Sequence, residues 1–175
     1  MNREDTAAVV RRLRGRYDAL PPGGKATLRR CATASELGAE GMFWRLVDDA
    51  HVPDDERWRM AHVVACFDAA GVGRERFARW LRGTAYGDVQ KPDDLPARAV
   101  RVRRMLASRD RDELVHHLRR LLRHGFQKSR RGVDWGALGA DILFWGDGVR
   151  RSWAEEFFTS KLISEPSLQK ESAHV

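Results

Sequence analysis

Cysteine is scarce in this chain, which has only Cys31 and Cys66 among 175 residues. The two are not closely spaced, and a disulfide scaffold would need more of them. We therefore expect a protein of a reducing, intracellular compartment whose fold depends on a hydrophobic core. Hydrophobic residues make up 42% of the chain, which is enough for such a core.

Long apolar runs are missing as well. No segment approaches the roughly 20 apolar residues that a membrane-spanning helix needs. Residues 1–5 do not begin the hydrophobic region of a secretory signal peptide. We expect a soluble, cytoplasmic protein without a membrane partner.

Common catalytic motifs are not found either. The sequence has no His-Glu-x-x-His, no Gly-x-Ser-x-Gly and no P-loop. His62 and Cys66 have the i, i+4 spacing of two metal ligands on a helix, but no further ligand pair has suitable spacing, so we expect both in the core. The sequence predicts no catalytic residue, no metal and no cofactor, and hence a protein that is not an enzyme.

Lysine is rare too, although the chain carries 32 Lys and Arg against 25 Asp and Glu, for a net charge of +7. Nearly all positive charge is therefore arginine, whose planar guanidinium matches phosphate oxygens. A positive balance favours a polyanionic partner, such as nucleic acid or an anionic membrane surface. A high-GC genome would also enrich arginine, so composition alone does not decide the partner.

Strand-like alternation is not evident, and almost every segment has a helical period. We expect an all-α fold of two packed helical bundles. Residues 83–96 are rich in helix breakers and are predicted to link an N-terminal bundle over 1–90 to a C-terminal bundle over 91–163. The polar tail, 164–175, is expected to be disordered.

The clearest amphipathic helix is predicted from residue 110 to about 126. Leucines gather on one of its faces, whereas Arg119, Arg120 and Arg123 fall on the opposite face. Asp134 is predicted to cap the next helix.

Several basic residues have no acidic partner at helical spacing. Arg101 and Arg104 are spaced i, i+3, so they share a helix face. Arg45 has apolar neighbours, which is unusual for a merely solvated charge. Point charges spread over a surface are what backbone binding needs. For any single arginine, a solvated face or an intrahelical ion pair remains the commoner explanation.

Several segments of the C-terminal half together form a recognisable family pattern. They are Arg101-Val102-Arg103-Arg104-Met105-Leu106, Glu113-Leu114, Leu118-Arg119-Arg120-Leu121-Leu122, Val133-Asp134-Trp135, Leu138, Asp141-Ile142, Trp145 and Val149-Arg150-Arg151-Ser152-Trp153-Ala154-Glu155-Glu156-Phe157. Through these segments about half of the chain resembles the CasB family, the small subunit of the type I-E CRISPR Cascade complex. A looser similarity covers Ala26-Thr27-Leu28-Arg29-Arg30.

The resemblance implies a non-catalytic protein of two helical bundles. Its implied partners are the large subunit, the crRNA-bound backbone subunits and a second copy of the chain. Its basic face is implied to contact the target or displaced DNA strand or the crRNA and to stabilise the R-loop. The resemblance implies this nucleic-acid-binding role for Lys25, Arg29, Arg30, Arg45, Arg101, Arg104, Arg119, Arg120 and Arg123. An alternative is an Arg-rich helical adaptor that docks acidic protein partners and has no role on nucleic acid.

Overall fold

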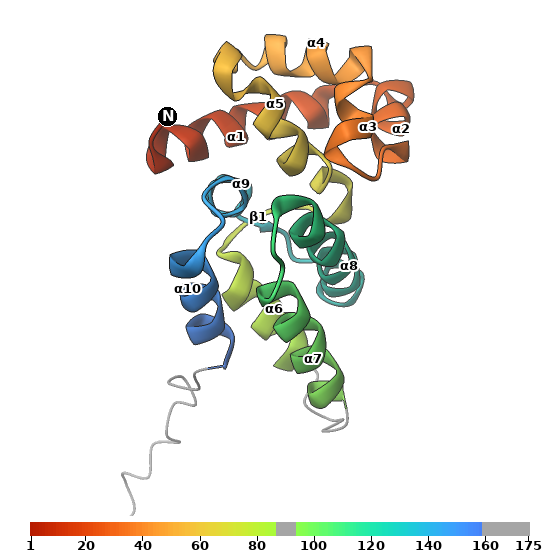
Figure 1. The fold of residues 1–175 in the computed structure, drawn as a ribbon. Coiled ribbons are helices and arrows are strands. Elements are labelled where there is room, and N and C mark those ends of the chain that lie inside the picture. Colours follow the sequence, from red (N-terminus) through yellow and green to blue (C-terminus); the bar gives the residue numbers. More distant parts are fainter. Residues whose placement is uncertain (87–93, 159–175) are drawn as a thin grey trace, which may run out of the picture.

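The helices of the chain stack in two bodies, one above the other in Figure 1, which shows a computed structural model. Residues 1–86 and 94–158 are described, so the predicted tail, 164–175, and half of the predicted linker, 87–93, lie outside the described residues. The described elements are α1 (Arg3–Ala19), α2 (Pro22–Arg30), α3 (Ala34–Gly38), α4 (Gly41–Asp49), α5 (Asp54–Val64), the 3-10 helix η1 (Phe67–Ala69), β1 (Val72–Glu75), α6 (Phe77–Tyr86), α7 (Asp94–Leu106), α8 (Arg111–Ser129), α9 (Trp135–Leu143) and α10 (Asp147–Phe158). The prediction of an all-α fold is confirmed.

Short polar side chains fix where the main helices begin. The Asn2 side chain accepts a hydrogen bond from the Asp5 amide at 2.9 Å and so caps α1. Asp110 caps α8 in the same way. Asp134 accepts from the amide of Gly136 at 2.9 Å, which confirms the predicted start of α9. Each cap satisfies an amide that would otherwise lack a partner.

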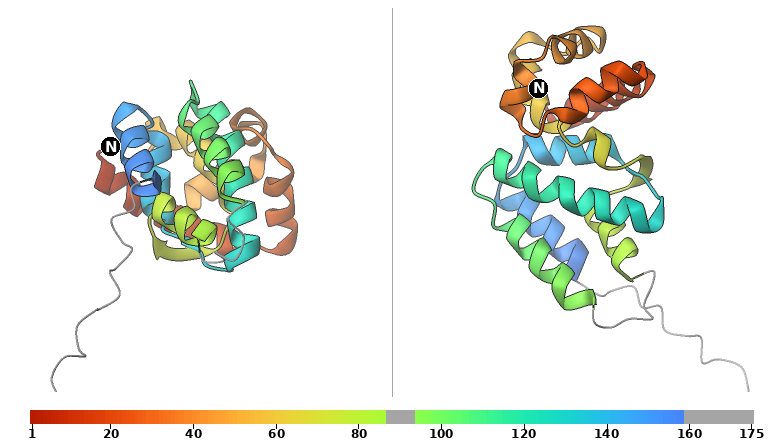
Figure 2. Two further views of the ribbon diagram at one scale, coloured as in Figure 1. Left: turned by 90° about the horizontal axis from the view of Figure 1, so that it is seen from below. Right: turned by 90° about the vertical axis from the view of Figure 1, so that its right-hand side faces the viewer.

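The upper body contains α1 to α5, and the lower body contains α6, α7, α8 and α10 (Figures 1 and 2). Helix α6 lies within the range predicted for the N-terminal bundle, yet it packs against α8 and α10. The spatial boundary between the bodies therefore precedes α6. Composition favoured residues 83–96 because breakers accumulate there, but breakers mark turns within a body as well as between bodies.

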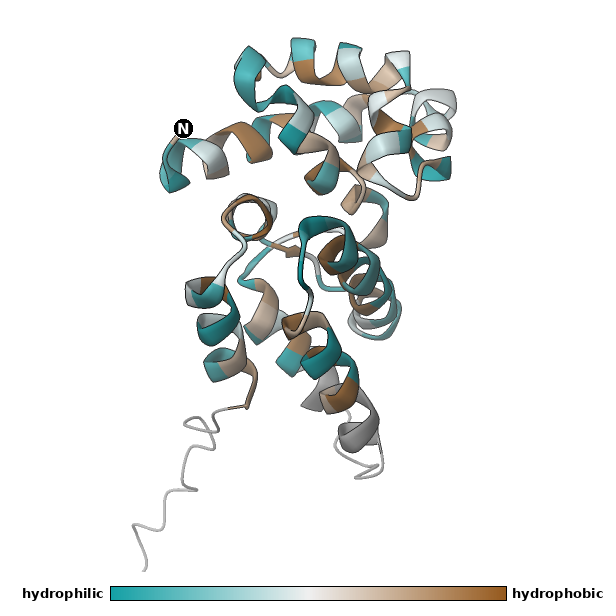
Figure 3. Ribbon diagram, viewed as in Figure 1, coloured by the Kyte–Doolittle hydropathy of each residue, from teal (hydrophilic) through white to brown (hydrophobic). Residues whose placement is uncertain are grey.

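Helix α9 lies between the two bodies and is mostly apolar (Figure 3), as expected of a helix whose residues are nearly all buried. Its one charged residue, Asp141, is buried and accepts a hydrogen bond from Trp153 Nε1 at 2.7 Å. It packs most extensively against α1. A Cβ atom on Gly139 would lie 2.6 Å from Val10 Cγ1, so the glycine permits this close approach of the two helices. No helix in the described part of the chain has the length and apolar character to cross a bilayer.

The strand β1 and the short helix α3 were not predicted. β1 pairs in parallel with Val133, which comes just before α9. A Cβ on Gly73 would lie 2.2 Å from the Gly132 carbonyl oxygen, so this crossing requires glycine. α3 begins with a capping box, in which Thr33 and Glu36 satisfy each other's amides. The four residues of β1 are too few to show the alternation of apolar and polar residues that marks a strand, and the five residues of α3 are too few to show a helical period.

Candidate nucleic-acid interface

A basic groove runs between α7 and α8, which pack side by side in the lower body (Figure 2, right). Its volume is about 360 Å³. We call this the α7–α8 groove. Its lining residues are Arg101 and Arg104 from α7 and His117, Arg120, Leu121, Arg123, His124 and Gln127 from α8.

Helical spacing explains why these side chains meet. Arg101 and Arg104 are one turn apart on α7, while Val102 and Met105 are buried and hold the helix in place. On α8, the lining positions 117, 120, 124 and 127 advance by three or four residues, so they form one continuous stripe. Leu114, Leu118 and Leu122, on the apolar side of α8, are fully buried.

The arginines of the groove differ in how they are held. Arg101, Arg104 and Arg120 are exposed, and within the described residues none of them forms an ion pair. Arg123 is half-exposed and donates to Asp68 Oδ2 at 2.7 Å. The groove therefore offers three uncompensated guanidinium groups and a fourth that is shared with a carboxylate.

His117 lies within this positive field. Burial lowers the pKa of His117 below its usual 6.5, and the nearby His116, Arg120 and Arg104 lower it further, whereas Glu113 acts in the opposite direction. The imidazole is therefore neutral at pH 7. An anion placed in the groove would reverse the balance of charge around it.

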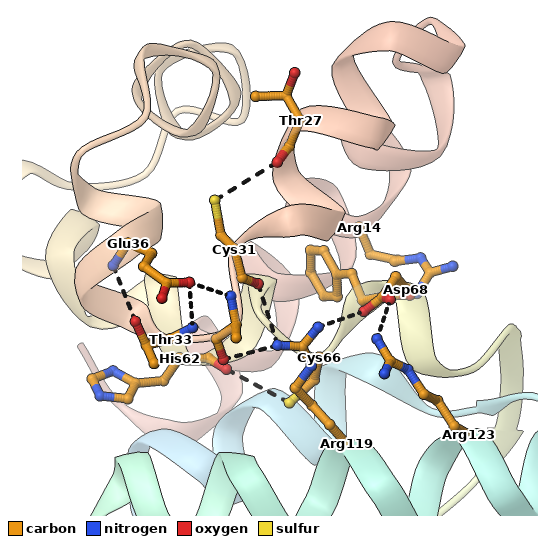
Figure 4. Close-up of polar contacts among 12 residues, drawn as sticks. Arg14, Thr27, Cys31, Thr33, Glu36, His62, Cys66, Asp68, Arg119 and Arg123 are labelled. Carbon is orange, nitrogen blue, oxygen red and sulfur yellow. Dashed lines mark hydrogen bonds and ion pairs between the residues drawn. The ribbon is translucent and has the colours of Figure 1, made fainter.

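Arg119 does not belong to the groove. Although predicted on the exposed polar face of its helix, it is only 9% exposed, so that prediction is wrong. Figure 4 shows its guanidinium pointing toward the upper body, where it donates to the carbonyls of Cys31 and Ala32 at 3.2 and 2.8 Å. The reason is that α8, although part of the lower body, also packs against α5 of the upper body. The face of α8 opposite its leucines is therefore not entirely solvated.

Asp68 connects this buried arginine to the groove. Its carboxylate is 7% exposed and lies 3.5 Å from Arg119 Nη2, while its other oxygen accepts from Arg123 (Figure 4). A buried carboxylate is stable only when it is paired in this way. The groove arginine Arg123 is thus also part of the contact between the two bodies.

The predicted basic residues of the upper body lie apart from the α7–α8 groove. Lys25 on α2 donates to the Asp18 carbonyl at 2.6 Å. Arg30 donates to the Thr27 hydroxyl at 3.3 Å, and Arg29 is exposed at the same end of α2. Arg45 is exposed on α4. The structure therefore brings together Arg101, Arg104, Arg120 and Arg123, but not these four.

Four lining residues were not predicted as part of a site, namely the apolar Leu121 and the polar His117, His124 and Gln127. The predicted site consists only of Lys and Arg, whereas histidine is weakly basic and glutamine is neutral. Their spacing relative to Arg120 was a usable signal, because a stripe on one helix face includes every third or fourth residue whatever its charge.

His62 and Cys66, the two residues with the spacing of metal ligands, lie in the core or next to it. Cys66 is buried, and its thiol donates to the His62 carbonyl at 3.7 Å. Burial raises the pKa of Cys66 to about 12. His62 lies 3.4 Å from Asp112. Within the described ranges, no three His, Cys, Asp or Glu side chains converge as a metal site would require.

Comparison with known proteins connects this arrangement to a family. Comparison with curated proteins finds no significant match. The fold is similar to that of a chain in the crystal structure of E. coli Cascade bound to a PAM-containing dsDNA target, with a TM-score of 0.63 and 21% identity over 85% of this chain and 95% of that chain. The family model for CRISPR-associated protein Cse2 matches residues 24–158. The predicted resemblance is confirmed, and the chain belongs to the Cse2 (CasB) family.

Proposed function

We propose that this chain is the non-catalytic small subunit of a type I-E CRISPR surveillance complex. In this role it binds the nucleic-acid backbone without reading sequence and stabilises the R-loop during crRNA-guided targeting of DNA. The observation that carries the proposal is the α7–α8 groove, where Arg101, Arg104 and Arg120 have no acidic partner among the described residues. Membership of the Cse2 family and the fold shared with a Cascade chain support the proposed place in such a complex.

The lining of the groove fits phosphate rather than bases. Guanidinium groups donate forked hydrogen bonds to phosphate oxygens, and such contacts carry no sequence information. Base stacking usually uses large exposed rings, and no Trp, Tyr or Phe is among the lining residues of the groove. Trp80 and Trp153, two tryptophans of the lower body, are buried.

Backbone contacts of this kind can stabilise an R-loop because strand exchange is nearly balanced. The RNA–DNA duplex that forms is about as stable as the DNA duplex that it replaces. A few phosphate contacts to one strand then shift the equilibrium toward the open state. The proposed nucleic-acid partners are the target or displaced DNA strand and the crRNA.

The proposed protein partners are the large subunit, the crRNA-bound backbone subunits and a second copy of the chain. Lys25, Arg29, Arg30 and Arg45 lie apart from the α7–α8 groove and remain proposed phosphate contacts at a separate surface. Arg119 is left out, because its guanidinium is buried against backbone carbonyls.

Charge reversal inside a reconstituted complex tests this function. Arg101→Glu with Arg104→Glu should shorten the lifetime of the R-loop while crRNA loading stays normal. The matched control is Arg16→Glu with Arg151→Glu, which changes the net charge equally at exposed residues outside the groove lining. Normal target binding by the groove variant would contradict the role of the α7–α8 groove. Failure of the wild-type chain to co-purify with a crRNA-bearing complex would contradict its place in a CRISPR surveillance complex.

The alternative is an adaptor whose arginines dock acidic proteins. The exposed Arg45, on a helix far from the groove in sequence and fold, suits either role. A salt titration of the free protein against single-stranded DNA of scrambled sequences separates the two. An adaptor would show no binding at moderate salt, whereas a backbone binder would bind all sequences equally.

A further inference from the structure

We infer that the α7–α8 groove binds phosphate together with a proton, and that His117 is the residue that takes the proton up. The inference rests on the proposed function, because it concerns the same groove. It makes affinity for nucleic acid depend on pH between about 5.5 and 7.5, where imidazole is the ordinary side chain that titrates.

The position of His117 carries the argument. Its ring lines the groove one turn before Arg120 on α8, and Arg104 of α7 lines the same groove close enough to lower the pKa of His117. A phosphate that contacts both arginines lies beside this imidazole. Arginine stays charged at every relevant pH, so it cannot exchange a proton when the phosphate arrives.

Cations surround His117 from both packed helices. On α7 they are Arg101 and Arg104, and on α8 the cation is Arg120. The ring centroid of the neighbouring His116 lies 5.4 Å from that of His117, and His116 also lowers the pKa of His117. Glu113 is the carboxylate that opposes them, and His124 lines the groove two turns further along. In the free protein, burial of the ring and this surplus of positive charge together disfavour the imidazolium form.

A bound phosphate offsets the contribution of these cations, whereas burial of the ring still lowers the pKa of His117. The negative charge of the phosphate offsets the guanidinium groups and favours the charged imidazole, which then donates a hydrogen bond to a phosphate oxygen. Binding is thus coupled to protonation of His117. The sign follows from linkage, because a pKa that rises on binding makes binding tighter as pH falls. A rise of one pKa unit corresponds to about a tenfold gain in affinity across the titration.

The test measures binding of the full chain to a thymidine oligonucleotide, whose bases do not titrate in this window. Anisotropy is followed from pH 5.5 to 7.5 at constant ionic strength with a dye that is insensitive to pH. The wild type should gain up to about tenfold in affinity as the pH falls. His117→Asn should show a flatter pH dependence, even if its affinity at pH 7.5 is unchanged.

Matched controls exclude other histidines. His51→Asn changes an exposed residue of the upper body with φ of 52°, a conformation that asparagine tolerates well, so its pH dependence should equal that of the wild type. His116→Asn and His124→Asn should also retain a pH dependence. If His117→Asn titrates like the wild type, or if His124→Asn alone loses the effect, the assignment is overturned.

Proton uptake can also be measured directly. Calorimetry in two buffers of different ionisation enthalpy at pH 6.5 should show net uptake for the wild type and less for His117→Asn. Binding that is the same at every pH overturns this inference and leaves the proposed function intact. No binding at any pH contradicts the proposed function itself.

Discussion

Neutralising two groove arginines should change how steeply nucleic-acid binding falls with salt. The perturbation is Arg101→Gln combined with Arg104→Gln. Both residues are exposed on α7, and glutamine keeps much of the stem and a similar helix propensity. The packing of α7 depends on the buried Val102 and Met105, which stay unchanged. The variant should therefore fold normally and lose only charge.

The magnitude follows from the number of cations in the groove. Each phosphate neutralised on a single strand contributes about −0.7 to the slope of log K against log salt, so four arginines give about −3. Removing two reduces the slope to about −1.5. Between 50 and 200 mM salt, the wild type should lose roughly 60-fold in affinity and the variant roughly 8-fold.

The assay is fluorescence anisotropy of the free protein with single-stranded oligonucleotides of scrambled sequence at several salt concentrations. Arg16→Gln with Arg151→Gln serves as the control of equal charge, and its slope should stay near that of the wild type. Equal slopes for the groove variant and the wild type would refute the reasoning. Slopes that differ between sequences would instead indicate contacts to bases.

Two predictions concern stability. Arg119→Met should lower the free energy of unfolding by about 2–4 kcal/mol in urea, because buried carbonyls and a buried carboxylate lose their donor. Its exposed neighbour Arg120→Met should change stability by less than about 0.5 kcal/mol, and equal effects would contradict the assigned burial. Gly139→Ala should cost about 1–3 kcal/mol through its clash with α1. Gly15→Ala, which meets nothing within 4 Å, should stabilise by up to about 1 kcal/mol, and thermal unfolding measures both.

The sequence was sufficient to predict the main helices and several of their ends. A strong 3.6-residue period and a capping carboxylate are local signals, so α8 and the start of α9 at Asp134 could be predicted. β1 could not, because its pairing with Val133 depends on a contact between residues distant in sequence. α3 did have a local signal, Thr33-Ala34-Ser35-Glu36, which matches a capping box.

The candidate site was predictable only in part, because charge and spacing identify a helix face but not what that face packs against. Arg101 and Arg104 were placed correctly on one face of α7, and the structure brings them opposite Arg120. Arg119 is the same residue type as Arg120 and directly precedes it on α8. It differs only in lying toward the loop at Cys31 in the upper body.

Two adjacent arginines on α8 thus have different roles, since Arg119 contacts the upper body and Arg120 lines the α7–α8 groove. The neighbouring Asp68 explains how the buried Arg119 is tolerated. Its buried carboxylate balances the charge of Arg119, whose burial would otherwise be costly, and it also holds Arg123 at the edge of the groove. This arrangement couples the contact between the two bodies to one wall of the basic groove. A phosphate that draws Arg123 toward the groove must compete with Asp68, whereas Arg101, Arg104 and Arg120 have no such competing carboxylate among the residues that the structure describes. Affinity for the backbone should therefore depend most on these three arginines, and the contribution of Arg123 should depend on how firmly the two bodies are joined.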